Sequence, residues 1–122
     1  MAKDHQLQTL SILALRKRKL FLLKKLRFSP QLIRASVVER FTKCGKPNCR
    51  CLQGHLHGPF YYLTQCLGVG RMRKFLLKTP ESQQQAREAV RAFNEYYDQL
   101  ELLSQINTEL LARGENLGVP PS

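Results

Sequence analysis

A dense cluster of cysteine and histidine residues constrains the fold of this chain more than any other feature. The stretch TKCGKPNCRCLQGHLHGPFYY, residues 42–62, contains three of the four cysteines and two of the three histidines. Cys44 and Cys49 flank the turn-forming quartet Gly-Lys-Pro-Asn, which bends the backbone and brings the two thiols together. Tetrahedral zinc takes four ligands of this kind, with sulfur at about 2.3 Å and nitrogen at about 2.0 Å. The spacing therefore predicts a Zn²⁺ ion held by Cys44, Cys49, Cys51 and His57.

The spacing alone does not fix the identity of the fourth ligand or of the metal. His57 precedes Gly58–Pro59, where a tight bend would fold the imidazole back toward the cysteines, but His55 is an alternative ligand. An iron–sulfur cluster would ask for a fourth thiol, and Cys66 lies in a strand pattern where a small buried residue is expected. No signal-peptide pattern begins the chain, so a cytoplasmic location is expected, where disulfides are rare.

The residues around the cluster predict a small antiparallel sheet. Residues 36–41 have the β-branched content of a strand, and residues 60–67 form a second strand pattern. Residues 71–77 predict a third strand, joined to the second across the turn Gly68–Val69–Gly70. The cluster thus lies in the connection between the first two strands. A bound metal there would compensate for the small core, since a sheet of this size is marginal alone.

Two helices are predicted on either side of this sheet. Residues 6–28 contain many Leu and Lys and no Gly or Pro, and the pattern ends before Ser29–Pro30. Thr79–Pro80–Glu81 supplies a capping residue, a proline at the first helical position and an early acid. Gly114 is the expected terminator of this second, longer helix.

The length and these elements together predict the fold class. A chain of 122 residues has room for one domain with a modest core, and no apolar run approaches the length of a membrane span. We expect an α+β single domain over residues 1–122. Its parts are a basic N-terminal helix (6–28), a small antiparallel sheet with a zinc knuckle (36–78), a long C-terminal helix (79–113) and a flexible tail (114–122).

Charge is distributed unevenly along the chain. Residues 1–78 contain seventeen Lys and Arg against two acids, whereas residues 79–122 contain three Arg against seven acids. Such an excess of positive charge repels itself without a partner, so DNA or RNA is the predicted partner, with an acidic membrane or an acidic protein as the alternative. Strand alternation places one of Tyr61 and Tyr62 in the core and leaves the other for base stacking. The residues predicted to contact nucleic acid are Arg16, Lys17, Arg18, Lys19, Lys24, Lys25, Lys43, Lys46, Arg50, Tyr61, Arg71, Arg73 and Lys74.

The long helix has an apolar seam of heptad spacing that indicates a partner surface. Its predicted contact residues are Phe93, Tyr96, Leu100, Leu103, Asn107 and Leu110. An Asn at such a position can fix the register of a parallel dimer, so a homodimer is one expectation. The alternative is that the seam packs on the first helix and the sheet of the same chain.

No catalytic constellation accompanies the cluster. A zinc deaminase would need an H-x-E motif and P-C-x2-C spacing, and neither is present. A catalytic zinc keeps one open position, whereas three cysteines and one histidine close the shell. Glu39 is the only acid of residues 5–78, so paired-carboxylate chemistry has no partner nearby. The chain is therefore predicted not to be an enzyme.

The cluster and its flanks resemble a bacterial family of small uncharacterised domains. That family has the pattern C-G-K-x-x-C-x-C followed by H-G-P and an aromatic pair. The matching residues are Val37–Val38–Glu39–Arg40, CGKPNCRC at 44–51, Gly54 and HGPFYYL at 57–63, and the resemblance spans about residues 34–110. It implies His57 rather than His55 as the ligand. The family is often found near integrases and transposases, which implies a mobile-DNA setting and no particular activity.

These observations predict a small zinc-stabilised accessory protein that binds nucleic acid in a mobile-DNA or other nucleoprotein complex. The alternative is an assembly factor that docks on a larger recombinase, transposase or ribonucleoprotein through its long C-terminal helix. The two differ in whether the isolated protein binds nucleic acid with a steep dependence on salt.

Overall fold

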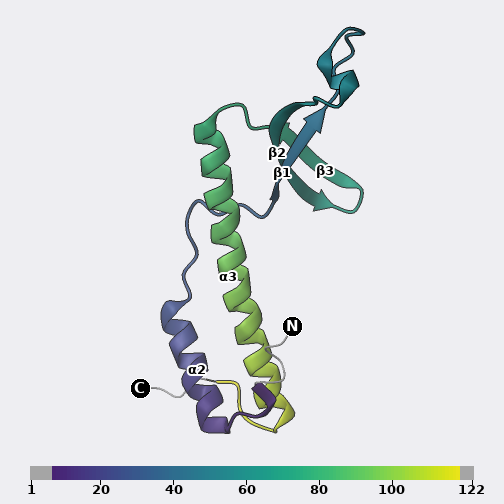
Figure 1. Ribbon diagram of the computed structural model, residues 1–122. Helices are drawn as coiled ribbons and strands as arrows, with labels where there is room; N and C mark the ends of the chain where they lie inside the picture. Colours follow the sequence, from purple (N-terminus) through teal and green to yellow (C-terminus); the bar gives the residue numbers. More distant parts are fainter. Residues whose placement is uncertain (1–6, 119–122) are drawn as a thin grey trace. The chain divides into compact units, whose positions relative to one another are not determined.

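A computed structural model of the chain describes residues 7–118 and shows two helices and a three-stranded antiparallel sheet (Figure 1). The elements in chain order are α2 (Ile12–Lys25), β1 (Ser36–Thr42), a 3-10 turn η1 (Arg50–Gln53), β2 (His57–Gly68), β3 (Arg71–Leu76) and α3 (Pro80–Ala112). The predicted α+β class is confirmed. Within these residues no helix is both long and apolar enough to cross a membrane. Gln6 of the predicted first helix and residues 119–122 of the predicted tail lie outside the described part.

The chain divides into two compact units, each with its own core. The helical unit consists of residues 7–28 and 94–118, and the sheet unit consists of residues 29–93. Helix α3 contributes its first turns to the sheet unit and its later turns to the helical unit. This division does not test the expectation of a single domain, which stays a prediction.

Helix α2 is shorter than the predicted helix of residues 6–28. It begins at Ile12 because the Ser11 hydroxyl accepts a hydrogen bond from the backbone N–H of Ala14 at 3.1 Å, which caps the helix. It ends at Lys25, since Leu26 already has an extended backbone, before the proline that was expected to stop the helix. An internal serine in an otherwise helical pattern thus marks the true start.

The core of the helical unit joins α2 to the last turns of α3. Leu15 and Leu22 of α2 are buried against Ile106 and Leu110 of α3, together with Leu7. Arg113, one residue past α3, donates hydrogen bonds to the carbonyl oxygens of three residues before α2: Leu7, Gln8 and Leu10. The guanidinium therefore ties the segment before α2 to the end of α3.

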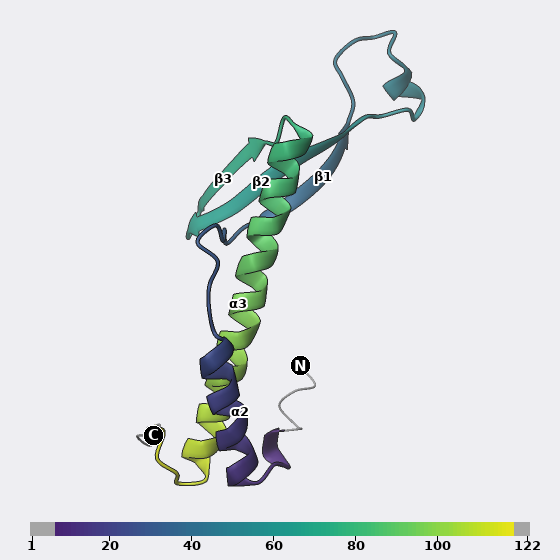
Figure 2. The same ribbon diagram turned by 90° about the vertical axis from the view of Figure 1, so that its left-hand side faces the viewer.

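The sheet unit has strand order β1-β2-β3, with both pairs antiparallel. Its core consists of Leu63, Leu77 and Ala86, and the first turns of α3 lie across one face of the sheet (Figure 2). The backbone N–H of Ile33 donates to the carbonyl oxygen of Ala89 at 3.0 Å, which holds the segment before β1 against α3. The predicted hairpin across Gly68–Gly70 is present.

The start of α3 lies where the sequence predicted it. The Thr79 hydroxyl accepts from the backbone N–H of Ser82 at 3.1 Å, and the Ser82 hydroxyl accepts from the backbone N–H of Thr79 at 3.2 Å. This reciprocal cap satisfies two N–H groups that the helix itself leaves unpaired. At the other end, Gly114 adopts a φ of 78°, a left-handed conformation that favours glycine after a helix.

Candidate metal centre

The cysteine cluster forms a short knuckle between β1 and β2, here defined as residues 43–56. Cys49 precedes η1, and its carbonyl oxygen accepts from the backbone N–H of Leu52 at 3.2 Å. Gly54 ends the turn with a φ of 97° and donates to the carbonyl oxygen of Cys51 at 3.3 Å. The tight turn brings Cys49 and Cys51 onto the same side of the knuckle, so that both thiols can bind the same metal ion.

The four predicted ligands lie together. The sulfur atoms of Cys44, Cys49 and Cys51 and one ring nitrogen of His57 are all within 4.8 Å of one another. The Sγ atoms of Cys44 and Cys51 are 3.6 Å apart, and Sγ of Cys49 is 2.9 Å from Nε2 of His57. The edges of a zinc tetrahedron with these ligands are about 3.5–3.8 Å long, from bond lengths of about 2.3 and 2.0 Å. The cluster therefore fits a metal ion of this size after small side-chain shifts.

The sheet brings His57 to the cysteines. Strand β2 begins at His57, three residues before the predicted start, and His57 pairs with Thr42 at the end of β1. The register shifts between Arg40 and Thr42, and this irregularity places the histidine beside the segment that leads to Cys44. The group of possible ligands in the described residues includes His57 and does not include His55.

Gly58 is required by the backbone at this irregularity. Its φ is 132°, a conformation that side chains with a Cβ rarely adopt. A Cβ added here would lie 2.8 Å from the carbonyl oxygen of Arg40 and 3.1 Å from the ring of Phe41. The close approach of β1 to the backbone beside His57 thus depends on glycine.

The thiols of the cluster have unequal acidity. Hydrogen bonding from the backbone N–H of Cys51, then from the Cys44 side chain, lowers the pKa of Cys49 to about 6. The backbone N–H of Lys46 acts to lower the pKa of Cys44, but hydrogen bonding to Cys49 and desolvation outweigh it and raise that pKa. Of these two thiols, Cys49 therefore becomes a thiolate, the form that binds metal, at the lower pH.

The burial of the ligands indicates a closed site. Cys51 has an exposed fraction of 0%, Cys44 and Cys49 are half-buried, and only His57 is exposed. The backbone N–H of Cys44 donates to Sγ of Cys51 at 3.3 Å, a bond that helps to fix the position of the buried sulfur. Four protein ligands complete a tetrahedral shell, which suits a structural metal rather than a catalytic one.

Cys66 lies apart from this group. It is exposed in β2, and its thiol contacts the carbonyl oxygen of Gly68 at 3.4 Å. The expectation that Cys66 is a small buried residue is therefore wrong. Among the described residues, Cys66 is not one of the four side chains that lie close enough together to bind a metal ion. The geometry therefore offers no fourth sulfur for an iron–sulfur cluster.

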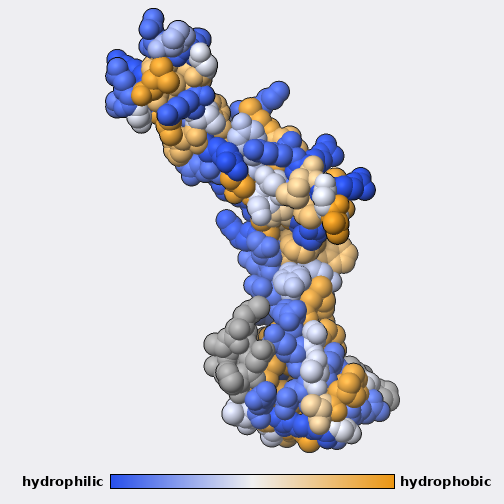
Figure 3. All heavy atoms as spheres, turned by 90° about the vertical axis from the view of Figure 1, so that its right-hand side faces the viewer, coloured by the Kyte–Doolittle hydropathy of each residue, from blue (hydrophilic) through white to orange (hydrophobic). Residues whose placement is uncertain are grey.

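Most of the cations predicted to contact nucleic acid are exposed, and hydrophilic side chains cover much of the face drawn in Figure 3. The exposed members of the set are Lys17, Arg18, Lys24, Lys25, Lys43, Lys46, Arg50, Arg71, Arg73 and Lys74. In residues 7–118 the ion pairs are Arg16–Glu115 and Arg113–Glu109, both in the helical unit. The cations of the knuckle and of β3 are therefore available to an external anion.

Two cations of α2 are used inside the protein instead. Lys19 has an exposed fraction of only 6%, and its ammonium donates to Oδ1 of Asn107 at 2.7 Å and to the carbonyl oxygen of Leu117. Arg16 is half-buried and donates to the carbonyl oxygen of Asn116 at 3.0 Å. The expectation that both contact phosphates is corrected, because each already holds the segment after α3.

Tyr61 also differs from the expectation. Its half-buried ring packs against the core of Leu63, Leu77 and Ala86, and the guanidinium of Arg87 lies 4.7 Å from the ring centroid. A base cannot stack on Tyr61 without displacing these contacts. Strand alternation does separate the two tyrosines, but the side on which α3 packs decides which of them is covered, and α3 lies far along the chain.

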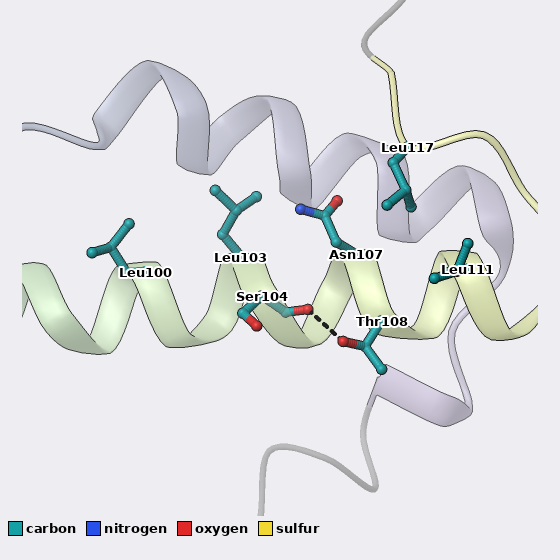
Figure 4. Close-up of a pocket in the computed structure, with 7 residues that line it drawn as sticks. All are labelled: Leu100, Leu103, Ser104, Asn107, Thr108, Leu111 and Leu117. Carbon is teal, nitrogen blue, oxygen red and sulfur yellow. Dashed lines mark hydrogen bonds between the residues drawn. The ribbon is translucent and has the colours of Figure 1, made fainter.

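The predicted partner seam is largely occupied by the protein itself. Leu110 is fully buried, and Leu103 and Asn107 point from α3 toward α2 (Figure 4). Tyr96 makes an edge-to-face contact with Phe28, with ring centroids 5.6 Å apart. Phe93 is half-buried, which leaves Leu100 as the one exposed member of the six, at 39%. The alternative of packing on the first helix describes this surface better than a dimer seam.

Comparison with protein families matches residues 12–74 to a domain of unknown function, DUF6788. The match includes α2 and ends within β3, whereas the resemblance in the sequence left the first helix out and included the long helix. No curated protein and no solved structure matches the chain. Because the matched region covers more than half of the chain, this protein belongs to the DUF6788 family.

Proposed function

We propose that this protein is a non-enzymatic accessory protein that binds nucleic acid and is stabilised by a zinc ion in its knuckle. The observation that carries the proposal is the unpaired positive charge of the sheet unit. Residues 29–93 contain eleven Lys and Arg against three acids, and neither ion pair of residues 7–118 lies in this unit. Cations without acidic partners attract a polyanion and release its counterions on binding.

Zinc is the metal that the ligand set favours. Three thiolates and one imidazole are soft to borderline ligands, which select zinc over magnesium or calcium. Such an ion would join Cys44, which follows β1, to His57, which begins β2, and so close the loop at its base. The exposed Lys43, Lys46 and Arg50 would then be held at fixed positions around the ion.

The role of the ion in this proposal is structural. The knuckle has one buried residue, Cys51, in its described length, so it has little hydrophobic core of its own. Metal binding supplies folding free energy where a hydrophobic core is too small. The proposal also keeps the mobile-DNA or nucleoprotein setting, which the resemblance alone supports.

The test combines metal analysis with binding measurements. We expect about one zinc per chain by mass spectrometry of the purified protein, and its loss in Cys51→Ser. We expect binding of both duplex and single-stranded DNA that weakens steeply with salt. If about five phosphates are contacted, the log–log slope should be near −4 to −5 on duplex DNA and about −3.5 on a single strand. A folded, metal-loaded protein that binds neither DNA nor RNA at low salt would exclude nucleic-acid binding and leave the assembly factor as the remaining function.

A further inference from the structure

The two faces of the sheet differ in what covers them. Val37, Tyr61 and Leu63 pack with Ala86 of α3, so their side chains lie on the face that α3 covers (Figure 2). Successive side chains of a strand point to opposite faces, so the residues between them lie on the other face. The pairing register aligns these residues across all three strands. We call this surface the open face, and it includes Val38, Arg40, Phe60, Tyr62, Lys74 and Leu76.

The open face is accessible in the described structure. None of its residues belongs to either hydrophobic core. Val38, Phe60 and Tyr62 are half-buried, as expected for the middle of a sheet with no further layer, and Leu76 is exposed at 37%. An apolar surface that remains accessible in this way indicates a binding site when its other properties match a partner.

Aromatic rings and cations alternate on this face. The ammonium of Lys74 lies 4.6 Å from the centroid of the Tyr62 ring. Phe60 is the register partner of Arg40 on the neighbouring strand. Each ring therefore has a cation near it. The exposed Lys74 ammonium lies over the Tyr62 ring, so a stacked base would take its place and the ammonium would move to the phosphate of the same nucleotide.

The charge of the open face is of one sign. The three strands contain one acid, Glu39, and its register partner Tyr61 lies on the covered face. The open face thus presents Arg40 and Lys74 without a carboxylate to compete for them. A duplex hides its bases and would use only these cations, whereas a single strand offers bases for the rings as well.

We infer that the open face binds single-stranded nucleic acid, with Tyr62 as the ring on which a base stacks and with Lys74 and Arg40 on the adjacent phosphates. The inference rests on the proposed function and names its surface. Tyr62 takes the role that the sequence assigned first to Tyr61, because the packing of Tyr61 against the core under α3 leaves Tyr62 as the accessible ring.

The test measures fluorescence anisotropy of the full-length protein with oligo(dT) of roughly 15 nucleotides, within known site sizes, and with a duplex of equal length. Tyr62→Leu should weaken binding of the single strand by about 5- to 100-fold and leave duplex binding nearly unchanged. Tyr62→Phe should retain the affinity because it keeps the ring. Leu76→Ala is the matched control, since it lies in the same row of the open face and has no ring.

A second arm tests the cation. Lys74→Gln should reduce the magnitude of the log–log salt slope on the single strand by about 0.7, the value for one lost phosphate contact. Arg91→Gln, an exposed cation of α3 in the same unit, should leave the slope as it is. A wild-type protein that binds DNA while Tyr62→Leu and Lys74→Gln bind equally well would overturn the inference and leave the proposed function intact. Failure of the folded wild type to bind either DNA or RNA at low salt would overturn both.

A crosslinking measurement covers the case in which Tyr62→Leu does not fold. Ultraviolet crosslinking of the wild type to oligo(dT) containing 4-thiothymidine should give adducts on Tyr62 or Phe60 by peptide mapping. Adducts confined to α2 or the knuckle would refute the assignment. A loss of dimerisation or of binding to phosphatidylglycerol vesicles in Lys74→Gln, with oligonucleotide binding unchanged, would likewise assign the face to another occupant.

Discussion

Three glycines of the metal-binding region allow the contribution of backbone geometry to be measured by the same substitution. A Cβ added to Gly45 would meet open space on a backbone without a left-handed φ, whereas Gly54 has open space but a φ of 97°. Gly58 has both a φ of 132° and a Cβ position 2.8 Å from the Arg40 carbonyl oxygen. Replacement of each by alanine therefore adds one source of strain at a time.

The expected costs follow from these differences. Gly45→Ala should change the free energy of unfolding by less than about 1 kcal/mol, and in the stabilising direction if its backbone suits alanine. Gly54→Ala should cost about 1–2 kcal/mol for the left-handed backbone. Gly58→Ala should cost about 2–6 kcal/mol, since about 1–3 kcal/mol of backbone strain adds to about 1–3 kcal/mol for a clash with main-chain atoms that cannot rotate away.

The position of Gly58 beside His57 extends the effect to the metal. Relief of the strain requires β1 and β2 to separate where Thr42 pairs with His57, which withdraws the imidazole from the cysteines. We expect Gly58→Ala to weaken zinc binding at least tenfold in competition with a chromophoric chelator, and Gly45→Ala to leave it unchanged. Urea unfolding of the zinc-loaded proteins gives the stabilities. Equal stability and zinc affinity for the Gly45 and Gly58 variants would refute the geometric reasoning.

Three further predictions test the metal centre, the buried lysine and the helical seam. In metal-free protein, absorbance near 240 nm should show one thiol ionising near pH 6, and this titration should be absent in Cys49→Ser. Because the pKa of Cys49 is lowered from 9.0, its ionisation contributes to stability fully above pH 9, and this contribution is lost as the pH falls through 6. Lys19→Ala should destabilise the helical unit by about 1–3 kcal/mol, since it leaves the partners of the ammonium unpaired, and should not change the salt slope of DNA binding. Lys17→Ala should reduce the magnitude of that slope and have little effect on the melting temperature. Leu110→Asp should unfold the helical unit as judged by circular dichroism, while Leu100→Asp should remain folded and lose any self-association measured by light scattering.

Features set by short-range chemistry could be predicted from the sequence. The start of α3 follows from the Thr79 cap and the proline after it, and the β2–β3 hairpin follows from the Gly68–Gly70 turn between two β-branched or aromatic runs. The ligand cluster belongs to this class too, because its four members lie within fourteen residues, from Cys44 to His57. A tight connection leaves few ways to arrange them.

Features set by distant residues could not be predicted in the same way. Lys19 and Lys17 look alike on the sequence, and only the position of Asn107, 88 residues further on, makes Lys19 a buried hydrogen-bond donor. The choice between Tyr61 and Tyr62 depends on which face α3 covers, and the cover by Arg87 has no local signal. The start of α2 at Ile12, later than predicted, is a closer case, since Ser11 is a good N-cap residue but the longer helical pattern outweighed it.

Because Arg16 and Lys19 form internal hydrogen bonds, the net charge of +11 overstates the number of cations that can contact nucleic acid. Only cations that reach phosphates release counterions, so charges that hold the segment after α3 add to the total without adding to affinity. The helical unit therefore offers fewer contacts than its basic sequence suggests. The sheet unit keeps its positive charge free of described ion pairs, and on the open face the cation Lys74 lies beside the ring of Tyr62. Attraction of phosphates and stacking of bases would act there on the same stretch of a strand, which is why a defect at Tyr62 should separate single-strand binding from duplex binding.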